Sequence, residues 1–573
     1  MGAKFAKASP SRILRSTVKC LPQRVMPQPA DLLITHAHVF TADSTRPSAE
    51  AVAVSGQRIA FVGSAADAES WRGPSTRVIH AEGRTLMPGF IDSHFHLLWG
   101  SLELGQIQLT EAVHWDDVNL AVRSFAYDHR GPPWLVGQGL HYNLLGDNQS
   151  LTRHHLDAIV ADRPLILFAY DHHTAWANTE ALRLGHLLQE GKVVAPNSQI
   201  VVGPDGLATG ELRERGAFDP IMDLIPLPTA DEKRALLHQG LAHAARLGLT
   251  SVHNMDGDAE QIALYAALED AGELTLRVYV SYSVTPDTPP EALAEAVAWR
   301  EQYQSDPSAL PTVAGPGMVR AGAVKFFMDG VIESYTALVL DQYADRPGYF
   351  GDANFSAEHF NRMAVEADRL GLQIFVHAIG DAAVRRTLDG YEAAQRANGR
   401  HREERRHRVE HIELIHPDDL PRFAQLGVIA SMQPLHAPVG PQSDVWPDRV
   451  GVGRWSRSFA WQTLREAGAR LAFGSDWPVV TQNPMRGVYM ALNREPWAPG
   501  LPDHRQTLAD TLLAYTRDAA YAEFQENVKG QLRAGMLADM VLLSDDIFAI
   551  PAETLDQVHP ILTVCNGRIV YEA

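Results

Sequence analysis

The chain has 573 residues, of which 45% are apolar and 21% charged, and its formal net charge is −19 at pH 7. This length predicts two or three structural units with a large core. The acidic balance argues against a nucleic-acid binder, which usually presents a basic face. Two cysteines, Cys20 and Cys565, exclude a disulfide framework and a thiolate metal cage. No stretch reaches the roughly 18 uninterrupted apolar residues of a membrane span, so no membrane partner is expected.

The N-terminal 25 residues are basic. They contain six Lys or Arg and no acid, and the first acid is Asp31. This composition resembles a transit peptide, but the long apolar core of a secretory signal is missing. We expect residues 1–29 to be a disordered extension; the alternative is an early start codon, because a second methionine, Met26, opens the strand-like part of the chain. We expect the protein to be cytoplasmic; organelle targeting through the basic segment is the alternative.

Strand-like segments with turn residues occupy both ends of the remaining chain. They cover about 30–63 and 530–573, where Asn566-Gly567 gives a hairpin signal. Because chain ends often lie close together, we expect residues 30–86 and 530–573 to form one composite β-sandwich domain.

Eight further β-like runs alternate with helical patterns. The predicted strands are 85–92, 249–255, 276–282, 321–327, 372–378, 407–412, 427–433 and 469–475. Eight β/α units predict an α/β fold, a (β/α)8 TIM barrel over residues 87–529. Residues 105–240 are too long for one β/α connection, so we expect them to form an insertion over the barrel mouth that distorts the barrel.

The segment "MPGFIDSHFHL" (87–97) carries an apolar run into two histidines, His94 and His96. In an extended strand, residues two apart point to the same side, so both imidazoles would project together. Converging imidazoles indicate a metal site, because neutral imidazole is the commonest metal ligand. The alternative is a turn histidine beside a histidine at the edge of the core.

Four more polar residues lie at predicted strand ends: Lys325, His377, His411 and Asp476. Taken singly, each has a structural explanation, such as a strand-end lysine, a core histidine or a helix-capping aspartate. Catalytic residues of (β/α)8 barrels sit at the carboxyl ends of the strands. Together with the paired histidines, these residues therefore predict one site at the barrel mouth.

The blocks "PGFIDSHFH", "VKFFMDG", "VHAIGD", "RVEHIEL", "MQPLH", "FGSDWPV", "AYTRDAAYA" and "GQLRAGMLADMVLL" occur in this order. Through these blocks, the chain resembles the amidohydrolase superfamily from about Asp31 to its end. It is most similar to the YtcJ-like branch, amidohydrolase family 3, which includes N-substituted formamide deformylase.

The resemblance implies a metal-dependent hydrolase that cleaves the C–N bond of an amide or N-substituted formamide with a metal-activated water. It implies that His94 and His96 hold one metal, that His377 and His411 hold a second, and that a carboxylated Lys325 bridges them. The cofactor implied is Zn²⁺, one or two ions per chain, with other divalent metals as the alternative. Asp476 would act as general base and then as general acid.

Other functions stay open at this point. An ester, lactone or cyclic amide is the alternative substrate, and a decarboxylase or isomerase is a different reaction that such barrels host. A non-catalytic scaffold is disfavoured, because the ligand set is present. We expect a small-molecule partner and no nucleic acid, and a homodimer is left open.

Four residues are candidates for substrate binding: Trp99, His173, Tyr335 and His436. Asp171 and His173 match a family block that reads Asp-Gly-His, in which His172 replaces the glycine. Tyr335 stands where many relatives carry Arg. These departures fall in substrate loops and leave the metal chemistry untouched.

Overall fold

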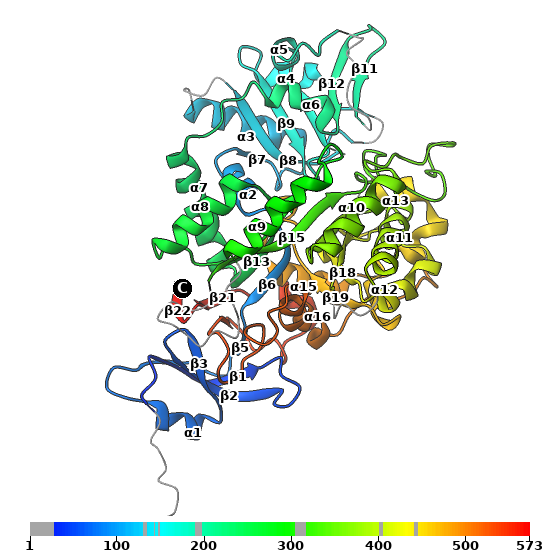
Figure 1. Cartoon of the computed structure of the whole chain (residues 1–573). Helices are drawn as coiled ribbons and strands as arrows, with labels where there is room; N and C mark the ends of the chain where they lie inside the picture. The colour runs from blue at the N-terminus through cyan, green and yellow to red at the C-terminus, as the bar shows by residue number, and fades with distance from the viewer. Residues whose placement is uncertain are drawn as a thin grey trace, which may run out of the picture.

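The computed structural model of the chain describes residues 28–129, 134–142, 144–146, 149–189, 198–303, 317–399, 405–440 and 445–573. The extension expected at residues 1–29 therefore lies almost wholly outside the described residues. Figure 1 shows a barrel in the middle, the insertion above it and the sheet formed by the two chain ends below. In the described part of the chain, no helix has both the length and the apolar character needed to cross a bilayer.

A parallel sheet of eight strands forms the barrel, which confirms the predicted α/β barrel fold. Its hydrogen-bonded order follows the chain from first strand to last, and a bridge between Phe95 and Trp477 brings the two edges together. The strands are β6 (Phe90–Phe95), β13 (Leu249–Gly257), β14 (Arg277–Ser283), β15 (Val319–Phe327), β16 (Gln373–Ala378), β17 (Arg408–His411), β18 (Ile429–Met432) and β19 (Arg470–Phe473).

The first predicted strand, 85–92, differs from the structure. It is two strands, β5 (Thr85–Pro88) and β6, which belong to two different sheets. Pro88 has no N–H to donate, and a Cβ at Gly89 would lie 2.2 Å from the Cγ2 atom of Thr250. The chain therefore passes from one sheet to the other at this Pro-Gly pair.

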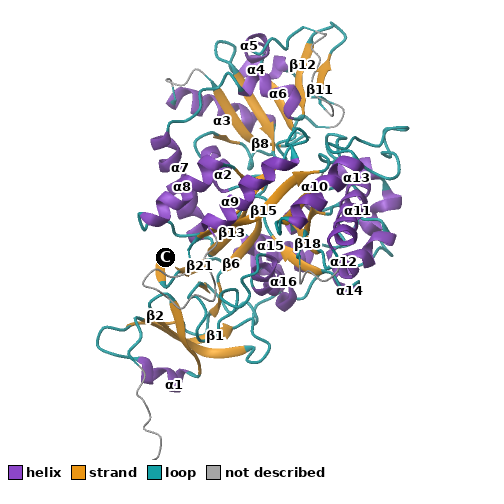
Figure 2. Cartoon of the chain, viewed as in Figure 1, coloured by secondary structure: helices purple, strands orange, loops and turns teal. Residues whose placement is uncertain are grey.

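Helices surround the barrel strands (Figure 2). In α10 (Ala357–Arg369), Ser356 caps the first turn by accepting from the His359 N–H, and Phe360, Met363 and Ala367 are buried at helical spacing. The other helices here are α2 (Leu97–Glu103), α7 (Ala230–Arg246), α8 (Ala259–Asp270), α9 (Leu293–Tyr303), α11 (Asp381–Asn398), α12 (Leu420–Leu426), α13 (Trp446–Val450), α14 (Trp461–Glu466), α15 (Pro484–Asn493), α16 (Leu508–Ala514) and α17 (Arg517–Ala522).

A separate six-stranded sheet lies within the predicted insertion. Its order is β11-β12-β10-β9-β8-β7, and buried apolar residues form cores on it. The helix α7, although it starts inside the predicted range 105–240, packs against α2 and β13 of the barrel. The elements of this part are β7 (Ile107–Gln108), α3 (Trp115–Asp128), β8 (Leu135–Leu140), α4 (Arg153–Ile159), β9 (Leu165–Ala169), β10 (Thr174–Ala177), α5 (Thr179–Leu184), β11 (Gln199–Val202), β12 (Ala208–Arg213) and α6 (Arg215–Met222).

The two ends of the described chain share one sheet of eight strands. Its order is β22-β21-β20-β5-β1-β2-β3, with β4 paired to β1. The two chain ends meet where β20 pairs antiparallel with β5, through Val541 opposite Met87. The strands are β1 (Leu32–Phe40), β2 (Ser48–Ser55), β3 (Arg58–Gly63), β4 (Arg77–His80), β5, β20 (Met540–Leu543), β21 (Pro560–Cys565) and β22 (Arg568–Glu572).

Candidate metal centre

Side chains from five barrel strands meet at the carboxyl end of the barrel. The ring of His411, at the end of β17, lies 4.6 Å from that of His94 and 4.5 Å from that of His377. Lys325 of β15 is fully buried, and its Nζ lies 3.2 Å from His94 Nε2. The structure thus brings together all six residues at strand ends: His94, His96, Lys325, His377, His411 and Asp476.

Asp476 lies between the histidines. Its Oδ1 is 3.1 Å from His96 Nε2 and 3.3 Å from His94 Nε2, and its Oδ2 is 3.9 Å from His411 Nδ1. Ligand atoms of His94, His411 and Asp476 lie within 4.8 Å of one another. The carboxylate is therefore close enough to hold a metal as well as to exchange protons beside one.

The backbone is unusual at two of these residues. His411 has φ of 75° and Asp476 has φ of 63°, in the left-handed region that non-glycine residues seldom adopt. Arg408 and Glu410 share one face of β17, so regular alternation would point His411 to the other face. The backbone of His411 is instead left-handed, and its imidazole ring reaches the same centre as the other histidines. Strained backbone of this kind concentrates at functional sites.

Asp92 fixes the turn that carries Asp476. Its carboxylate accepts hydrogen bonds from the backbone N–H groups of His94, at 3.1 Å, and of Ser475, at 2.9 Å. A Cβ at Gly474 would lie 2.5 Å from the backbone nitrogen of His94. Glycine in "FGSDW" therefore lets the loop after β19 approach the end of β6.

The electrostatics of the centre suit a cation. Burial and the nearby Lys325 hold the pKa of both His94 and His377 well below the usual range, so these imidazoles are neutral and have a free lone pair. At His96, burial alone would lower the pKa, but the carboxylates of Asp256 and Asp476 raise it to about 9. Among the described residues, Asp476 Oδ1 and His436 Nε2 are buried without a hydrogen-bond partner. Neutral imidazoles, acidic neighbours and unsatisfied acceptors together fit a bound metal ion.

Two residues that the sequence analysis did not select orient His94. Glu410 Oε2 lies 2.8 Å from His94 Nδ1, which leaves Nε2 facing the centre. The guanidinium of Arg408 donates to both oxygens of Glu410, at 2.8 and 3.0 Å. Both side chains are completely buried. Their only signal in the sequence is the alternation of polar residues in "RVEHIEL".

Two further acids lie behind other histidines. Asp256 Oδ1 is 3.2 Å from His96 Nδ1. Glu413 Oε1 is 3.4 Å from Nδ1 of His436, whose Nε2 is 3.7 Å from Asp476 Oδ2. Neither acid is recognisable from the sequence, because each meets its histidine only when β6 pairs with β13 and β17 with β18.

The centre opens into a cavity of about 1860 Å³ between the barrel and the insertion. Trp99, His173 and His436 line this cavity, and the ring of Trp99 lies 4.9 Å from that of His96. His173 is paired with Glu214 at 2.9 Å, and its ring lies 5.9 Å from that of His377. Tyr335 is not among the lining residues, and its hydroxyl donates to Asp345.

Several known proteins are similar to this chain over most of its length. Residues 77–571 match the model of the amidohydrolase family. The chain is 31% identical to Protein LONG AFTER FAR-RED 3 of Arabidopsis thaliana, over 90% of this chain and 87% of that one. It is 26% identical to the N-substituted formamide deformylase of Arthrobacter pascens, over 96% and 99% of the two chains. The crystal structure of an uncharacterized metal-dependent hydrolase from Pyrococcus furiosus superposes with a TM-score of 0.66 at 26% identity, covering 89% of this chain and 98% of that one. The chain therefore belongs to the amidohydrolase family, as its sequence blocks predicted.

Proposed function

We propose that the protein is a metal-dependent hydrolase that cleaves the C–N bond of an amide or N-substituted formamide. The observation that carries this proposal is the convergence of four histidines, a lysine and an aspartate at the mouth of one barrel. The similar chains named as a formamide deformylase and a metal-dependent hydrolase support it. The enclosed position of the centre in the cavity favours a small-molecule substrate.

The side chains of His94, His96, His377 and His411 would hold the metal, with zinc as the expected ion. Lys325 would hold the metal together with these histidines. Among the described residues, no carboxylate lies within ion-pair distance of its buried Nζ. Carboxylation would convert this buried ammonium into an oxygen ligand. When bound, the metal supplies a Lewis acid for the substrate carbonyl and lowers the pKa of water.

Asp476 would move the proton. Burial alone would raise the pKa of its carboxyl, but the close imidazoles of His96 and His411 hold that pKa below its ordinary value. The group is therefore ionised at neutral pH and able to accept a proton from the attacking water. It would then deliver that proton to the nitrogen that leaves. We expect His436 and His173, which line the cavity beside the centre, to hold the substrate carbonyl.

A hydrolysis screen tests the proposal. Amides, N-substituted formamides, esters and lactones would be offered to metal-loaded protein, with Asp476→Asn as the inactive control. We expect turnover of amides or formamides that disappears in the control. Turnover of esters or lactones alone would move the protein to the alternative substrate class. No turnover of any class by protein that holds its metal would contradict the proposal.

A further inference from the structure

Three side chains form one wall of the cavity beside the metal centre: Trp99, Glu103 and His172. Trp99 and Glu103 lie four residues apart on α2, and therefore on one face of the helix. The ring of Trp99 lies 4.9 Å from that of His96 and 4.5 Å from that of His172. His172 Nδ1 is 3.5 Å from Glu103 Oε1. The proposed hydrolysis uses none of these contacts.

Glu103 is a buried acid, and among the described residues no Lys or Arg forms an ion pair with it. Only 4% of the residue is exposed, and its Oε1 has no hydrogen-bond partner among the described residues. Burial raises the pKa of Glu103 well above the usual range, and burial also lowers the pKa of His172 to about 3. This carboxyl is buried without a cationic partner in the described structure, so a cation that enters the cavity and donates a hydrogen bond to it would stabilise it.

His172 holds a costly backbone conformation. Its φ of 60° lies in the left-handed region, which costs a non-glycine residue about 1–3 kcal/mol. Glycine would adopt this φ without strain. A histidine nevertheless occupies this position, with its ring against Trp99 and beside Glu103. We infer that its side chain has a functional role in the cavity.

The charges around the cavity have one predominant sign. Its Lys and Arg residues are Arg215, Lys325 and Arg486, and Lys325 belongs to the metal centre. Acids are more numerous: Glu103, Asp171, Glu214, Asp219, Glu232, Asp256, Asp329, Glu333, Glu413, Asp476 and Asp556. A cavity lined in this way raises the local concentration of cations.

We propose that Trp99, Glu103 and His172 form a subsite for a cationic group of the substrate, such as an ammonium or amidinium, next to the bond that is hydrolysed. The face of Trp99 attracts the cation, and Glu103 Oε1 accepts its hydrogen bond. This inference rests on the proposed function for its place in the reaction, and it narrows the substrate to amides with a positively charged substituent.

Binding of benzamidine and benzamide, measured by calorimetry on the metal-loaded protein, tests the subsite. The two probes share a flat ring and differ in charge. Because a hydrogen bond to a charged group is worth about 1.5–3 kcal/mol, we expect benzamidine to bind at least about tenfold more tightly. Glu103→Gln should bring the two affinities within about twofold. Asp219→Asn, which also removes one acid of the cavity, is the matched control and should keep the preference.

His172→Gly gives a second, independent readout. It should weaken the benzamidine preference while leaving the melting temperature equal to or above that of the parent, because the backbone strain is relieved. Equal binding of the two probes by the parent, or an unchanged preference in both variants, would overturn the subsite. Binding does not require turnover, so a clear preference in a protein that hydrolyses no amide would uphold the subsite and refute the proposed function. Amide turnover without any preference for benzamidine would uphold the proposed function and refute the subsite.

Discussion

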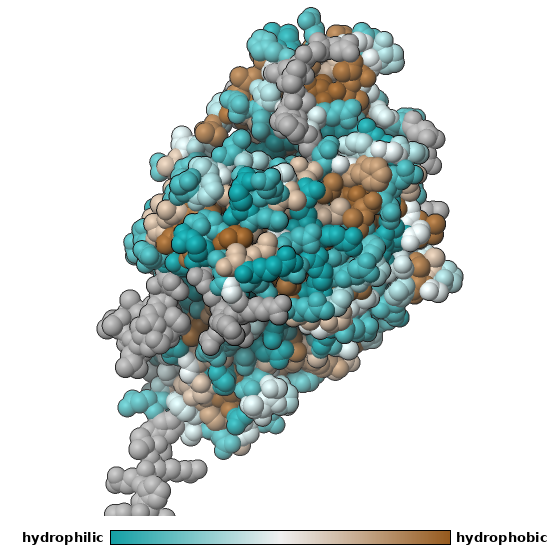
Figure 3. Space-filling view, turned by 45° about the vertical axis from the view of Figure 1, so that its right-hand side comes forward, coloured by the Kyte–Doolittle hydropathy of each residue, from teal (hydrophilic) through white to brown (hydrophobic). Residues whose placement is uncertain are grey.

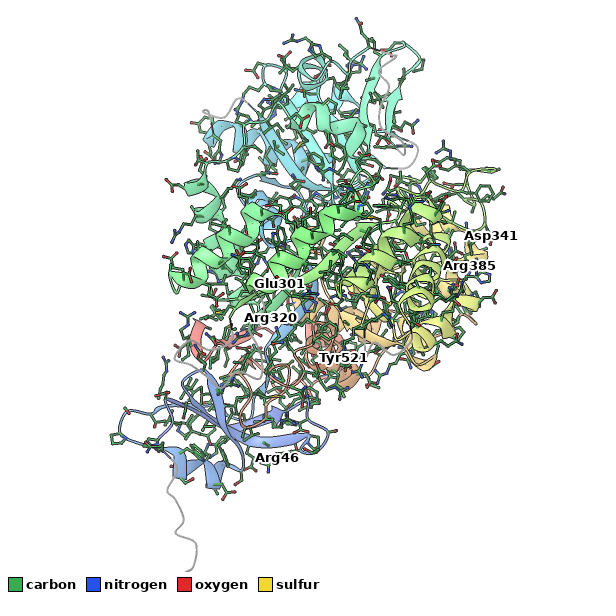
Figure 4. The ribbon with its side chains drawn as sticks, in the orientation of Figure 1. Arg46, Glu301, Arg320, Asp341, Arg385 and Tyr521 are labelled. Atoms are coloured by element: carbon green, nitrogen blue, oxygen red, sulfur yellow. The ribbon has the colours of Figure 1, made fainter. Side chains whose placement is uncertain are left out.

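The two ends of the barrel both bury charged side chains, and they differ in how those charges are balanced. At the end away from the insertion, where Figure 4 labels Arg320, the carboxylate of Glu523 is surrounded by three basic groups. It lies 2.5 Å from Lys529 Nζ, 3.3 Å from His253 Nε2 and 3.4 Å from the guanidinium of Arg320. Although burial alone would raise the pKa of Glu523, these neighbours hold it below its ordinary range. This cluster neutralises its own charge.

The carboxyl end is built differently. Its histidines are neutral or lie beside acids such as Asp256 and Asp476. It opens to a large cavity, while the pocket beside Glu523 and Lys529 holds only about 10 Å³. Burial of charge alone therefore does not identify a functional site. Buried titratable groups next to accessible space do.

The molecular surface shows a related contrast. The face in Figure 3 is largely hydrophilic, and apolar side chains gather in separate patches on it. Around the cavity, exposed apolar residues such as Leu227 and Val439 lie on the rim with exposed charged residues such as Arg215, while the charged groups of the metal centre are buried. Polar chemistry is thus concentrated in the interior of the barrel mouth.

Asp476→Asn should have the largest effect on catalysis at the carboxyl end. Asparagine keeps the size of the side chain but cannot take up a proton, so turnover should fall about 10²–10⁴-fold. Turnover and metal content would be measured on the same preparation, with Asp219→Asn as the control. Near-normal turnover would remove Asp476 from proton transfer. Loss of metal together with turnover would show that Asp476 is mainly a ligand.

Glu523→Gln should affect stability and leave the chemistry intact. Without its counter-charge, the buried Lys529 is left with an unbalanced charge, and breaking a buried pair of this kind costs about 3–5 kcal/mol. Denaturant unfolding would measure the fall in the free energy of unfolding. Turnover per folded molecule should stay close to that of the parent. Parental stability in this variant would contradict the structural role of the cluster.

Glu410→Gln should have the smallest of the three effects, on metal affinity. The amide cannot supply the negative charge that orients His94, and losing such a partner typically weakens metal binding about 10–100-fold. Competition with a chelator would measure the affinity, with Glu523→Gln as the control that keeps it. Equal affinities for the parent and Glu410→Gln would mean that His94 needs no orienting carboxylate.

The sequence was most informative where chemistry falls at strand ends. The HxH pair of His94 and His96, and the strand-end positions of His377 and His411, follow from periodicity and family blocks, and the barrel order brings them together. The partners of these residues were not predictable. Glu410 and His94 are 316 residues apart, and only closure of the barrel places one behind the other.

Local geometry also escaped prediction. The segment 85–92 was predicted as one strand, whereas close packing of Gly89 against Thr250 divides it between two sheets. The left-handed conformations of His411 and Asp476 have no sequence signal either, because neither residue is glycine. Such positions are set by tertiary packing, which overrides the local preference of the residue.

The metal content of the purified protein is the sharpest test of the metal centre. Elemental analysis of the parent and of a His94→Ala/His96→Ala double variant would be compared, and circular dichroism would confirm that both chains are folded. The account predicts one or two divalent ions per chain in the parent, with zinc as the expected metal, and a loss of metal in the folded double variant. An unchanged metal content in the double variant, or a parent that hydrolyses its substrate at full rate with no metal, would contradict it.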